Sequence, residues 1–226
     1  MTAASDGTIA THLAEIRERI ASAAGAAGRR PEEITLVAVS KEVDAVAVAD
    51  AHAAGQHDFG ENRAQELVAK VAALESRGLD PQQLELAWHF IGRLQRNKIK
   101  AIATHVALWH SIDRLELGTE IARHAPTARV LVQVNVSGEE QKGGCDPRDV
   151  PALVDGLGHL GLAVGGLMTV PPLAGDPRPH FAGLRDLATR LGLTTLSMGM
   201  SGDFEAAIGE GSTLVRVGRA VFGPRA

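Results

Sequence analysis

Lys41 is the residue whose type and position point most directly to covalent chemistry. It follows the apolar run at residues 35–40 (TLVAVS), where an expected strand stops and a side chain can enter a site. The other lysines fall on expected helices or in an expected loop: Lys70, Lys98, Lys100 and Lys142. A neutral lysine amine attacks carbonyl compounds, and burial or a nearby cation increases the neutral fraction. Lys41 is therefore a candidate Schiff-base lysine; the alternative is a solvated lysine that closes a strand.

Residues suited to binding a phosphate follow two apolar runs near the C-terminus. The segment at 198–208 (MGMSGDFEAAI) places Ser201, Gly202 and Asp203 at the start of a short expected helix, and Gly218 ends the final apolar run. Serine hydroxyls, and backbone N–H groups made accessible by glycine, are donors that proteins use to bind phosphate. The alternative is an ordinary capped helix after a glycine turn, with Asp203 interacting with the helix dipole.

Arg216 is expected to point into the interior of the fold. Side chains alternate between the two faces of a strand, so Val215 and Val217 share the face that packs against helices and Arg216 takes the other. A buried guanidinium requires a hydrogen-bond acceptor. The residues alone leave two kinds of acceptor open: a carboxylate inside the protein, or an oxygen or ring nitrogen of a ligand.

These candidate residues lie at the ends of short apolar runs, and the runs alternate with amphipathic, alanine-rich stretches. Eight runs are visible, at residues 35–40, 57–61, 87–92, 107–112, 129–136, 163–170, 194–200 and 213–218. Expected helices with apolar residues three and four apart lie between them, at 46–54, 63–76, 115–124, 150–160 and 181–191. A further expected helix, at 9–24, precedes the first run.

This alternation predicts the α/β class, with parallel strands joined by helices. Eight such units predict a single (β/α)8 TIM barrel with an extra N-terminal helix, and one domain is expected to span residues 1–226. An open doubly wound sheet is the alternative, which is disfavoured because no GxGxxG follows the first run. TIM-barrel sites lie at the carboxyl ends of the strands, so the candidate residues are expected to converge there.

Composition excludes several classes of function. The 226 residues are 45% hydrophobic and 22% charged, with a net charge of −4, which argues against general binding of nucleic acids or anionic membranes. The single cysteine, Cys145, lies in a polar loop without an activating base, and the nine histidines show no HxH or HExxH spacing. Neither a disulfide nor a metal site is expected. The chain has no tyrosine, so no reaction here can use a tyrosine acid or base.

A cytoplasmic location is expected, because the N-terminus lacks an apolar signal core. The stretch at 156–175 has no Asp, Glu, Lys or Arg, but its six glycines indicate a buried strand between loops rather than a membrane span. The basic run at 93–100 (RLQRNKIK) is interpreted as a solvated helix face, with a patch that binds a small anion as the alternative. His89 and His110 lie within expected strands and are interpreted as core histidines.

Eight segments along the chain resemble, in the same order, sequence blocks of the pyridoxal 5′-phosphate (PLP) homeostasis protein family. They are LVAVSK at 36–41, FGENRAQE at 59–66, WHFIGRLQRNK at 88–98, HSID at 110–113, VQVNVSGEEQKGG at 132–144, GLMTVPP at 166–172, LSMGMSGDFEAAI at 196–208 and GSTLVRVGRAVFG at 211–223. The resemblance covers nearly the whole chain, and several long blocks in order are far more specific than one short motif.

The resemblance implies a barrel related to the N-terminal domain of alanine racemases, with PLP as the cofactor in a Schiff base with Lys41. It places the phosphate against Ser201 and the backbone of Gly218 and Arg219, and Asn62 and Arg216 near the ring. The implied cofactor-binding residues are Lys41, Asn62, Met198, Ser201, Arg216, Gly218 and Arg219.

Two residues depart from the family pattern. Glu42 begins the segment after the lysine, where the family often has a proline-containing turn. Arg219 stands where Thr or Ser is common, which removes a hydroxyl donor to the phosphate and leaves the backbone donors.

The resemblance further implies a function in intracellular vitamin B6 homeostasis, holding PLP and handing it to PLP-dependent apoenzymes without robust turnover. A racemase of this fold uses the lysine and a tyrosine from a second domain of the partner subunit, and this chain has neither the tyrosine nor residues to spare for such a domain. No catalytic residue is assigned, and we expect a monomer with no metal, nucleic-acid or membrane partner. The alternatives are a PLP-dependent racemase-like enzyme of low activity, a phosphosugar aldolase and a scaffold with a vestigial site.

Overall fold

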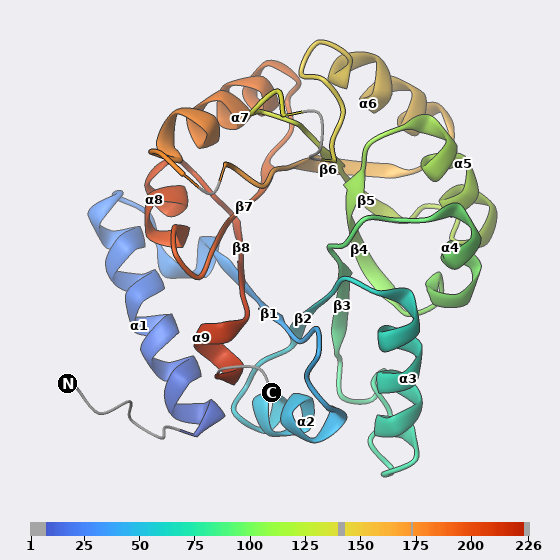
Figure 1. The fold of residues 1–226 in the computed structure, drawn as a ribbon, viewed down its shortest axis with the longest axis vertical. Coiled ribbons are helices and arrows are strands. Elements are labelled where there is room, and N and C mark those ends of the chain that lie inside the picture. The colour runs from blue at the N-terminus through green and yellow to red at the C-terminus, as the bar shows by residue number, and fades with distance from the viewer. Residues whose placement is uncertain (1–7, 140–142, 173, 224–226) are drawn as a thin grey trace.

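The computed structural model describes residues 8–139, 143–172 and 174–223. Parallel strands pair in sequence order, and the last strand pairs with the first, so the sheet closes into a barrel (Figure 1). The strands are β1 (Thr35–Val39), β2 (Asp58–Glu61), β3 (Ala87–Phe90), β4 (Val106–Ile112), β5 (Arg129–Gln133), β6 (Ala163–Met168), β7 (Thr195–Met200) and β8 (Leu214–Val217). The prediction of a TIM barrel is confirmed, and the alternative of an open sheet is wrong.

Helices surround the barrel and cover the outer face of the sheet (Figure 1). They are α1 (Ile9–Ala26), α2 (Ala45–Ala53), α3 (Ala64–Glu75), α4 (Arg96–Ile102), α5 (Leu115–His124), α6 (Val150–His159), α7 (Arg178–Arg190), α8 (Phe204–Gly209) and α9 (Arg219–Phe222), with a 3-10 turn η1 (Pro31–Glu33). The sequence signals act locally: Asp44, for example, caps α2 by accepting from the backbone N–H of Ala47 at 2.8 Å.

Two sets of apolar side chains form the core. The larger set lies between the sheet and the helices and includes the fully buried Trp88 and Trp109. A separate, smaller set comes from alternate positions on the strands and fills part of the barrel interior: Val37, Leu108, Leu131, Met168 and Leu214. Each fully buried large apolar side chain contributes about 1.5–3 kcal/mol, so the two sets together supply most of the driving force for folding.

Helix α1 covers the seam at which β8 meets β1. It packs against α8, α9 and α2, and its apolar face consists of Leu13, Ile16, Ile20 and Ala24. His12 Nδ1 lies 3.0 Å from the carbonyl oxygen of Val221 in α9. The guanidinium of Arg19 lies 4.6 Å from the ring centre of Phe204 in α8. The extra N-terminal helix is therefore an integral part of the wall that closes the barrel.

One strand ends earlier than its apolar run predicts. The run continues to residue 136, but β5 stops at Gln133 because the chain changes its pairing partner. Val134 still donates to the carbonyl oxygen of Met168 in β6 at 2.8 Å, but Asn135 donates to that of Cys145 at 2.9 Å and so leaves the pairing with β6. The loop after β5 thus folds back on the strand end.

Among the described residues, no helix combines the length and apolar character needed to cross a lipid bilayer.

Candidate functional site

A cavity of about 690 Å³ opens at the carboxyl ends of the strands. Its walls come from the ends of β1, β7 and β8 and from the segments that follow β1, β2, β3, β6, β7 and β8. Six of the seven residues implied by the resemblance line it: Lys41, Asn62, Ser201, Arg216, Gly218 and Arg219. Residues from distant parts of the sequence are therefore brought to one site, where TIM barrels generally bind their ligands.

Met198 does not join this group, and the expectation for it is corrected. Its side chain is fully buried in the core, whereas Met200 lines the cavity. The pairing of β7 with β8 shifts register between Ser197 and Met200, which breaks the alternation of side chains. Gly199 lies within this irregularity with a φ of 93°, and a Cβ on it would lie 2.7 Å from that of Ala207. The irregularity leaves Met198 in the core instead of the cavity.

Lys41 lies directly after β1 on the cavity wall, where it is half-buried. Its amine makes no hydrogen bond or ion pair with any residue that the structure describes. Lys70, by contrast, is 6% exposed and fully engaged in polar contacts. Lys41 therefore combines partial burial with an amine that is available to a ligand in the cavity.

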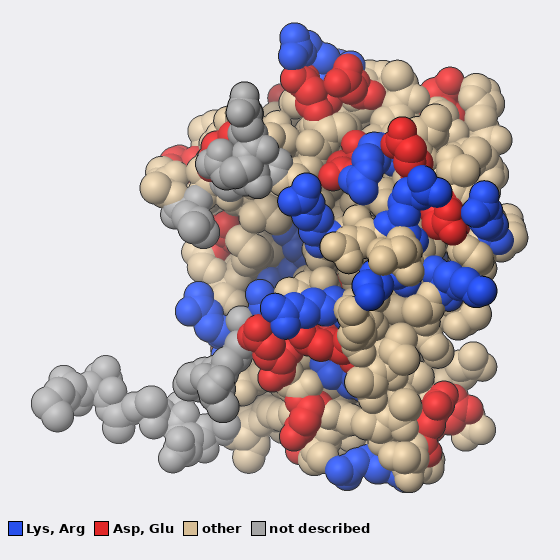
Figure 2. Space-filling view, turned by 45° about the vertical axis from the view of Figure 1, so that its right-hand side comes forward, with Lys and Arg blue, Asp and Glu red and all other residues tan. Residues whose placement is uncertain are grey.

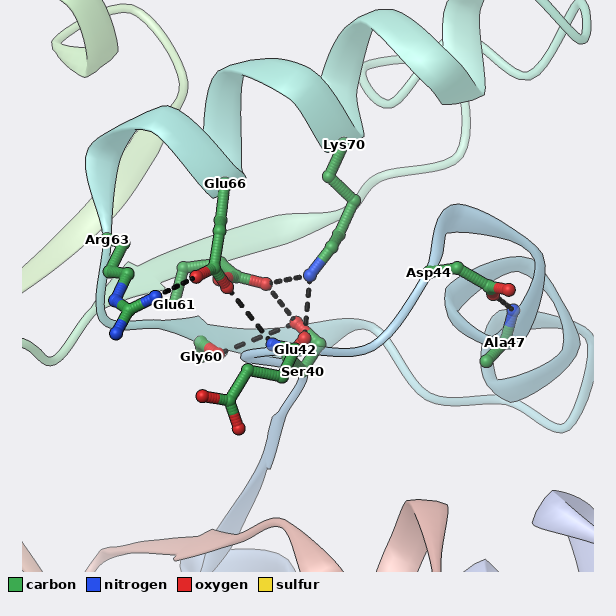
Figure 3. A network of polar contacts seen from close by, with 9 residues as sticks. All are labelled: Ser40, Glu42, Asp44, Ala47, Gly60, Glu61, Arg63, Glu66 and Lys70. Atoms are coloured by element: carbon green, nitrogen blue, oxygen red, sulfur yellow. Dashed lines mark hydrogen bonds and ion pairs between the residues drawn. The ribbon is translucent and has the colours of Figure 1, made fainter. Parts of the chain in front are cut away.

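Helix α3 holds the backbone at Ser40 and Glu42, the two neighbours of Lys41 in the sequence (Figure 3). Lys70 Nζ donates to the carbonyl oxygen of Ser40 at 2.6 Å, and the backbone N–H of Glu42 donates to Glu66 Oε2 at 3.0 Å. Glu66 and Lys70 are four residues apart and share one face of the helix. Glu42 has a φ of 61°, an uncommon conformation for a residue other than glycine, which its bond to Glu66 supports. Two side chains of one helix thus fix the peptide units that flank Lys41.

Lys70 also forms a buried ion pair with Glu61 at the end of β2. Ser40 Oγ donates to Glu61 Oε1 at 2.6 Å, while Glu61 Oε2 is buried with no partner among the described residues. Burial raises the pKa of Glu61, and the ammonium of Lys70 opposes that rise. From the sequence, Lys70 is simply a helical lysine. The signal that sets it apart is its place three residues after Leu67, on the apolar face of α3.

Arg216 points inward from β8 and reaches the cavity, as the alternation along the strand predicts. Its Nη1 donates to Ser197 Oγ at 2.6 Å, and its Nη2 donates to the carbonyl oxygen of Thr169 at 2.8 Å. Arg216 forms no ion pair with a carboxylate of the described residues. The alternative in which a carboxylate inside the protein accepts from Arg216 therefore does not hold among these residues. Burial lowers the pKa of Arg216 to about 10, and the charge of Asp203 opposes that shift.

The turn after β7 presents backbone donors to the cavity. Ser201 and Gly202 line the cavity, and the backbone N–H groups of both lack an acceptor within the described parts of the chain. Asp203 precedes α8 but does not cap it; its Oδ1 accepts from the backbone N–H of Met200 at 2.6 Å. Asp203 therefore closes the turn, and the free donors around it suit an anionic group.

Asn62 follows β2 and lines the cavity, and its Oδ1 atom is buried with no partner among the described residues. The backbone at Gly92 packs directly against it. A Cβ added at residue 92 would lie 2.1 Å from the carbonyl oxygen of Asn62, so only glycine permits this approach. The close contact between the two loops sets the position of Asn62.

Replacing Gly92 by alanine is expected to lower the free energy of unfolding by about 1–3 kcal/mol, because the added methyl group must displace the backbone of Asn62. Gly158→Ala is the matched control, since an added Cβ there meets no atom within 4 Å. Residue 158 lies in α6, so alanine is expected to stabilise the protein by up to about 1 kcal/mol. Urea unfolding measures both changes; an unchanged midpoint for Gly92→Ala would contradict the predicted clash.

The remaining candidates carry less chemistry. Burial raises the pKa of the Cys145 thiol to about 11, which makes it a poor nucleophile near neutral pH. No group of three or more His, Cys, Asp or Glu side chains within the described residues could hold a metal ion.

The basic run at 93–100 leads into α4, which buries Ile99 and Ile102 and exposes Arg96 and Lys100. Figure 2, turned toward this side of the barrel, shows basic and acidic side chains mixed on the surface.

Comparisons with known proteins agree with this architecture. The family profile described as alanine racemase, N-terminal domain, matches residues 11–226. The pyridoxal phosphate homeostasis protein of Pseudomonas aeruginosa is 49% identical over 228 residues, covering 96% of each chain. That of Escherichia coli is 41% identical over 230 residues, covering 96% of this chain and 97% of the relative. PipY of Synechococcus elongatus PCC7942, solved with PLP bound, is 36% identical with a TM-score of 0.82, covering 95% of this chain and 100% of PipY.

These similarities span the whole barrel, including every strand end that surrounds the cavity. Identities of 41–49% over nearly the full length of both partners confirm the resemblance carried by the eight sequence segments. The chain therefore belongs to the pyridoxal phosphate homeostasis protein family.

Proposed function

We propose that this protein binds PLP in the cavity as a Schiff base on Lys41. It holds the cofactor in the cytoplasm and delivers it to PLP-dependent apoenzymes, and so acts in vitamin B6 homeostasis. The observation that carries the proposal is the amine of Lys41, half-buried in the cavity and unpaired with the described residues, while its backbone is fixed on both sides. The names of the curated relatives and the PLP-bound structure of PipY support the same assignment.

The residues around the cavity fit PLP. The volume of about 690 Å³ accommodates a ligand of this size. Asn62 Oδ1 is a buried polar atom without a partner among the described residues, and Arg216 is a buried cation without a described carboxylate. When bound, PLP supplies an aldehyde that an amine can capture reversibly, together with a phosphate and a ring nitrogen that fix its orientation.

Each residue has a role that follows from its chemistry. Lys41 Nζ, in its neutral form, attacks the aldehyde carbon, and the aldehyde oxygen leaves as water; the reverse reaction with water releases the cofactor for delivery. Ser201 and the backbone N–H groups of Gly218 and Arg219 donate to the phosphate. Arg216 carries only donors, so beside the ring nitrogen it keeps that nitrogen unprotonated and weakens the electron sink that catalysis on PLP requires.

Covalent capture is tested on the purified protein. Adding PLP is expected to produce an absorbance band near the visible range, and borohydride reduction followed by peptide mapping is expected to place the label on Lys41. Mixing the loaded protein with an apoenzyme and following the recovery of that enzyme's activity tests delivery. A protein that stays colourless with excess PLP would instead support a scaffold with a vestigial site.

Ser201→Ala and Arg216→Gln are each expected to weaken PLP binding by roughly ten- to a hundredfold. Losing one hydrogen bond to a charged group costs about 1.5–3 kcal/mol, which corresponds to that change in affinity. Equilibrium dialysis gives the dissociation constants, and Ser137→Ala, a substitution in the loop after β5, is the control. Unchanged affinity for PLP in both variants would contradict the proposed contacts with the phosphate and the ring.

A PLP-dependent racemase-like enzyme of low activity remains the second candidate, because the alanine racemase profile covers the barrel. Racemisation needs one group to remove a proton on one face of the substrate and another to return it on the opposite face. Lys41 serves one face, but the chain has no tyrosine for the other. We expect no turnover in the common enzyme range of about 1–10³ s⁻¹ with alanine or other amino acids. A circular-dichroism assay on PLP-saturated protein measures this, and a rate in that range would establish the enzyme instead.

A further inference from the structure

A continuous chain of hydrogen bonds runs through the barrel interior from Arg216 to Asp58. Arg216 Nη1 lies 2.6 Å from Ser197 Oγ, which lies 2.8 Å from His110 Nδ1. His110 Nε2 lies 2.8 Å from His89 Nδ1, and His89 Nε2 lies 2.9 Å from Asp58 Oδ1. The chain joins β8, β7, β4, β3 and β2, so it crosses the barrel instead of following one strand.

The two ends fix the direction of every bond in this chain. A guanidinium can only donate, so Ser197 Oγ accepts from Arg216 and its own proton is free to go to His110 Nδ1. His110 is then protonated on Nε2 and donates to His89 Nδ1, and His89 donates from Nε2 to the carboxylate of Asp58. The opposite direction fails at Asp58, because a neutral His89 that donated from Nδ1 would turn an unprotonated Nε2 toward the carboxylate, and neither of those atoms can donate.

The residues in the middle of this hydrogen-bond chain are buried, so each of them must keep its hydrogen-bond partners. Ser197 and His110 are completely buried and His89 is 4% exposed, so water cannot replace a lost partner in the barrel interior. Burial lowers the pKa of His110 well below its ordinary value, with the charge of Arg216 adding to the effect, so His110 stays neutral and can accept at Nδ1.

The far end of the chain lies at the opposite mouth of the barrel. Asp58 is the first residue of β2, and its side chain is 32% exposed. It lines a small opening of about 260 Å³ together with Glu33, Thr35 and Arg129. One end of the hydrogen-bond chain therefore meets solvent at the amino ends of the strands. The other end is the guanidinium of Arg216 at the cavity.

We propose that Ser197, His110, His89 and Asp58 are positioning residues that act through Arg216, holding its guanidinium in one orientation toward the cavity. The proposal rests on the proposed function, since it gives Arg216 a ligand to meet. Thr169 holds the other arm through its carbonyl oxygen, so the two bonds together prevent the guanidinium from rotating. Asp58 thus influences cofactor binding from the opposite end of the barrel without contacting the cofactor.

The first test needs no cofactor. Nitrogen-15 NMR of the histidine side chains is expected to show protonated Nε2 and bare Nδ1 in both His89 and His110. The guanidinium of Arg216 is expected to give separate Nη signals in the wild type, which merge in Ser197→Ala because rotation becomes free. Nδ1 protonation in either histidine, or Arg216 signals that are already merged in the wild type, would overturn the proposal.

The second test is a double-mutant cycle on PLP affinity. Ser197→Ala is expected to weaken binding by roughly two- to thirtyfold, the range typical of residues that act at a distance from a ligand. In an Arg216→Gln background the same substitution is expected to change nothing further, because its effect passes through Arg216. Ser197→Thr keeps the hydroxyl and is expected to keep wild-type affinity. An equal loss in both backgrounds would assign Ser197 a merely structural role and overturn the proposal.

The third test works at Asp58, whose side chain is 32% exposed, so the substituted group itself is not part of the buried core. Asp58→Leu removes the last acceptor and is expected to weaken PLP binding, whereas Asp58→Asn keeps an acceptor and is expected to bind normally. Glu33→Gln, at the same opening but outside the chain of bonds, is the matched control. Asp58→Leu with wild-type affinity would overturn the proposal for Asp58. Absence of PLP binding in the wild type would instead refute the proposed function, and the NMR result would still decide the bonding pattern.

Discussion

Replacing Lys41 by alanine is expected to abolish covalent retention of PLP. Borohydride reduction of the wild type should fix one cofactor per chain, and the variant should retain none above background, with the absorbance band lost as well. The physical reason is that Lys41 presents an amine in the cavity with no partner among the described residues, whereas the nearby amine of Lys70 is held by Ser40 and Glu61. Mass spectrometry of the reduced protein measures the retained cofactor.

Lys100→Ala is the matched control for this experiment, because Lys100 is exposed on α4 and faces away from the core. It is expected to retain the full label. Circular dichroism should show the same fold for both variants, since Lys41 makes no polar contact with the described residues that folding would lose. Label found on another lysine of the wild type would contradict the assignment of Lys41.

Replacing Lys70 by alanine is expected to lower the free energy of unfolding by about 3–5 kcal/mol. The change leaves Glu61 buried without its cation, and a buried charge whose partner is removed costs about that much. The carbonyl oxygen of Ser40 also loses its donor, so the peptide unit before Lys41 is released. Urea unfolding of the variant measures the loss, and an unfolding midpoint equal to that of the wild type would contradict the role of the pair.

Two observations separate this mechanism from simple loss of packing. Adding Glu61→Gln to the Lys70→Ala variant removes the buried charge and is expected to recover part of the stability. The pH dependence provides the second: burial already raises the pKa of Glu61, and removing Lys70 raises it further. A carboxyl group with a raised pKa in the folded state contributes stability at low pH that is lost as pH rises. The variant is therefore expected to become less stable above the ordinary value of about 4.5, relative to the wild type.

Much of the fold is predictable because its signals are local and repeated. Each strand is a short apolar run, each expected helix has apolar residues at helical spacing, and eight repeats of the pair leave few architectures. Lys41 and Arg216 are predictable for the same reason: one ends a strand, and the other interrupts a run of valines at a position that must face inward.

The features that the sequence leaves hidden depend on contacts between distant residues. Met198 is misplaced because the register shift in β7 arises from packing of Gly199 against α8, which no local pattern reveals. Lys70 bonds to Ser40, 30 positions earlier in the chain, so its helical spacing gives only a weak signal. His89 and His110 are correctly expected in the interior, but their alignment with Ser197 follows from the curvature of the closed barrel.

The position of α1 across the seam has a consequence for folding during synthesis. Arg17 of α1 donates to the carbonyl oxygen of Ala54 after α2, at 2.9 Å, so one side of α1 finds its partner early. The other side packs on α8, which begins at Phe204, and at roughly 5–20 residues per second the ribosome takes on the order of 8–30 s to travel from Ala54 to that point. During that interval the nascent chain carries a helix with part of its apolar stripe uncovered, which is the kind of surface that general chaperones bind. Helix α1 is thus made before α8 but finds its full set of packing partners only after α8 has been synthesised.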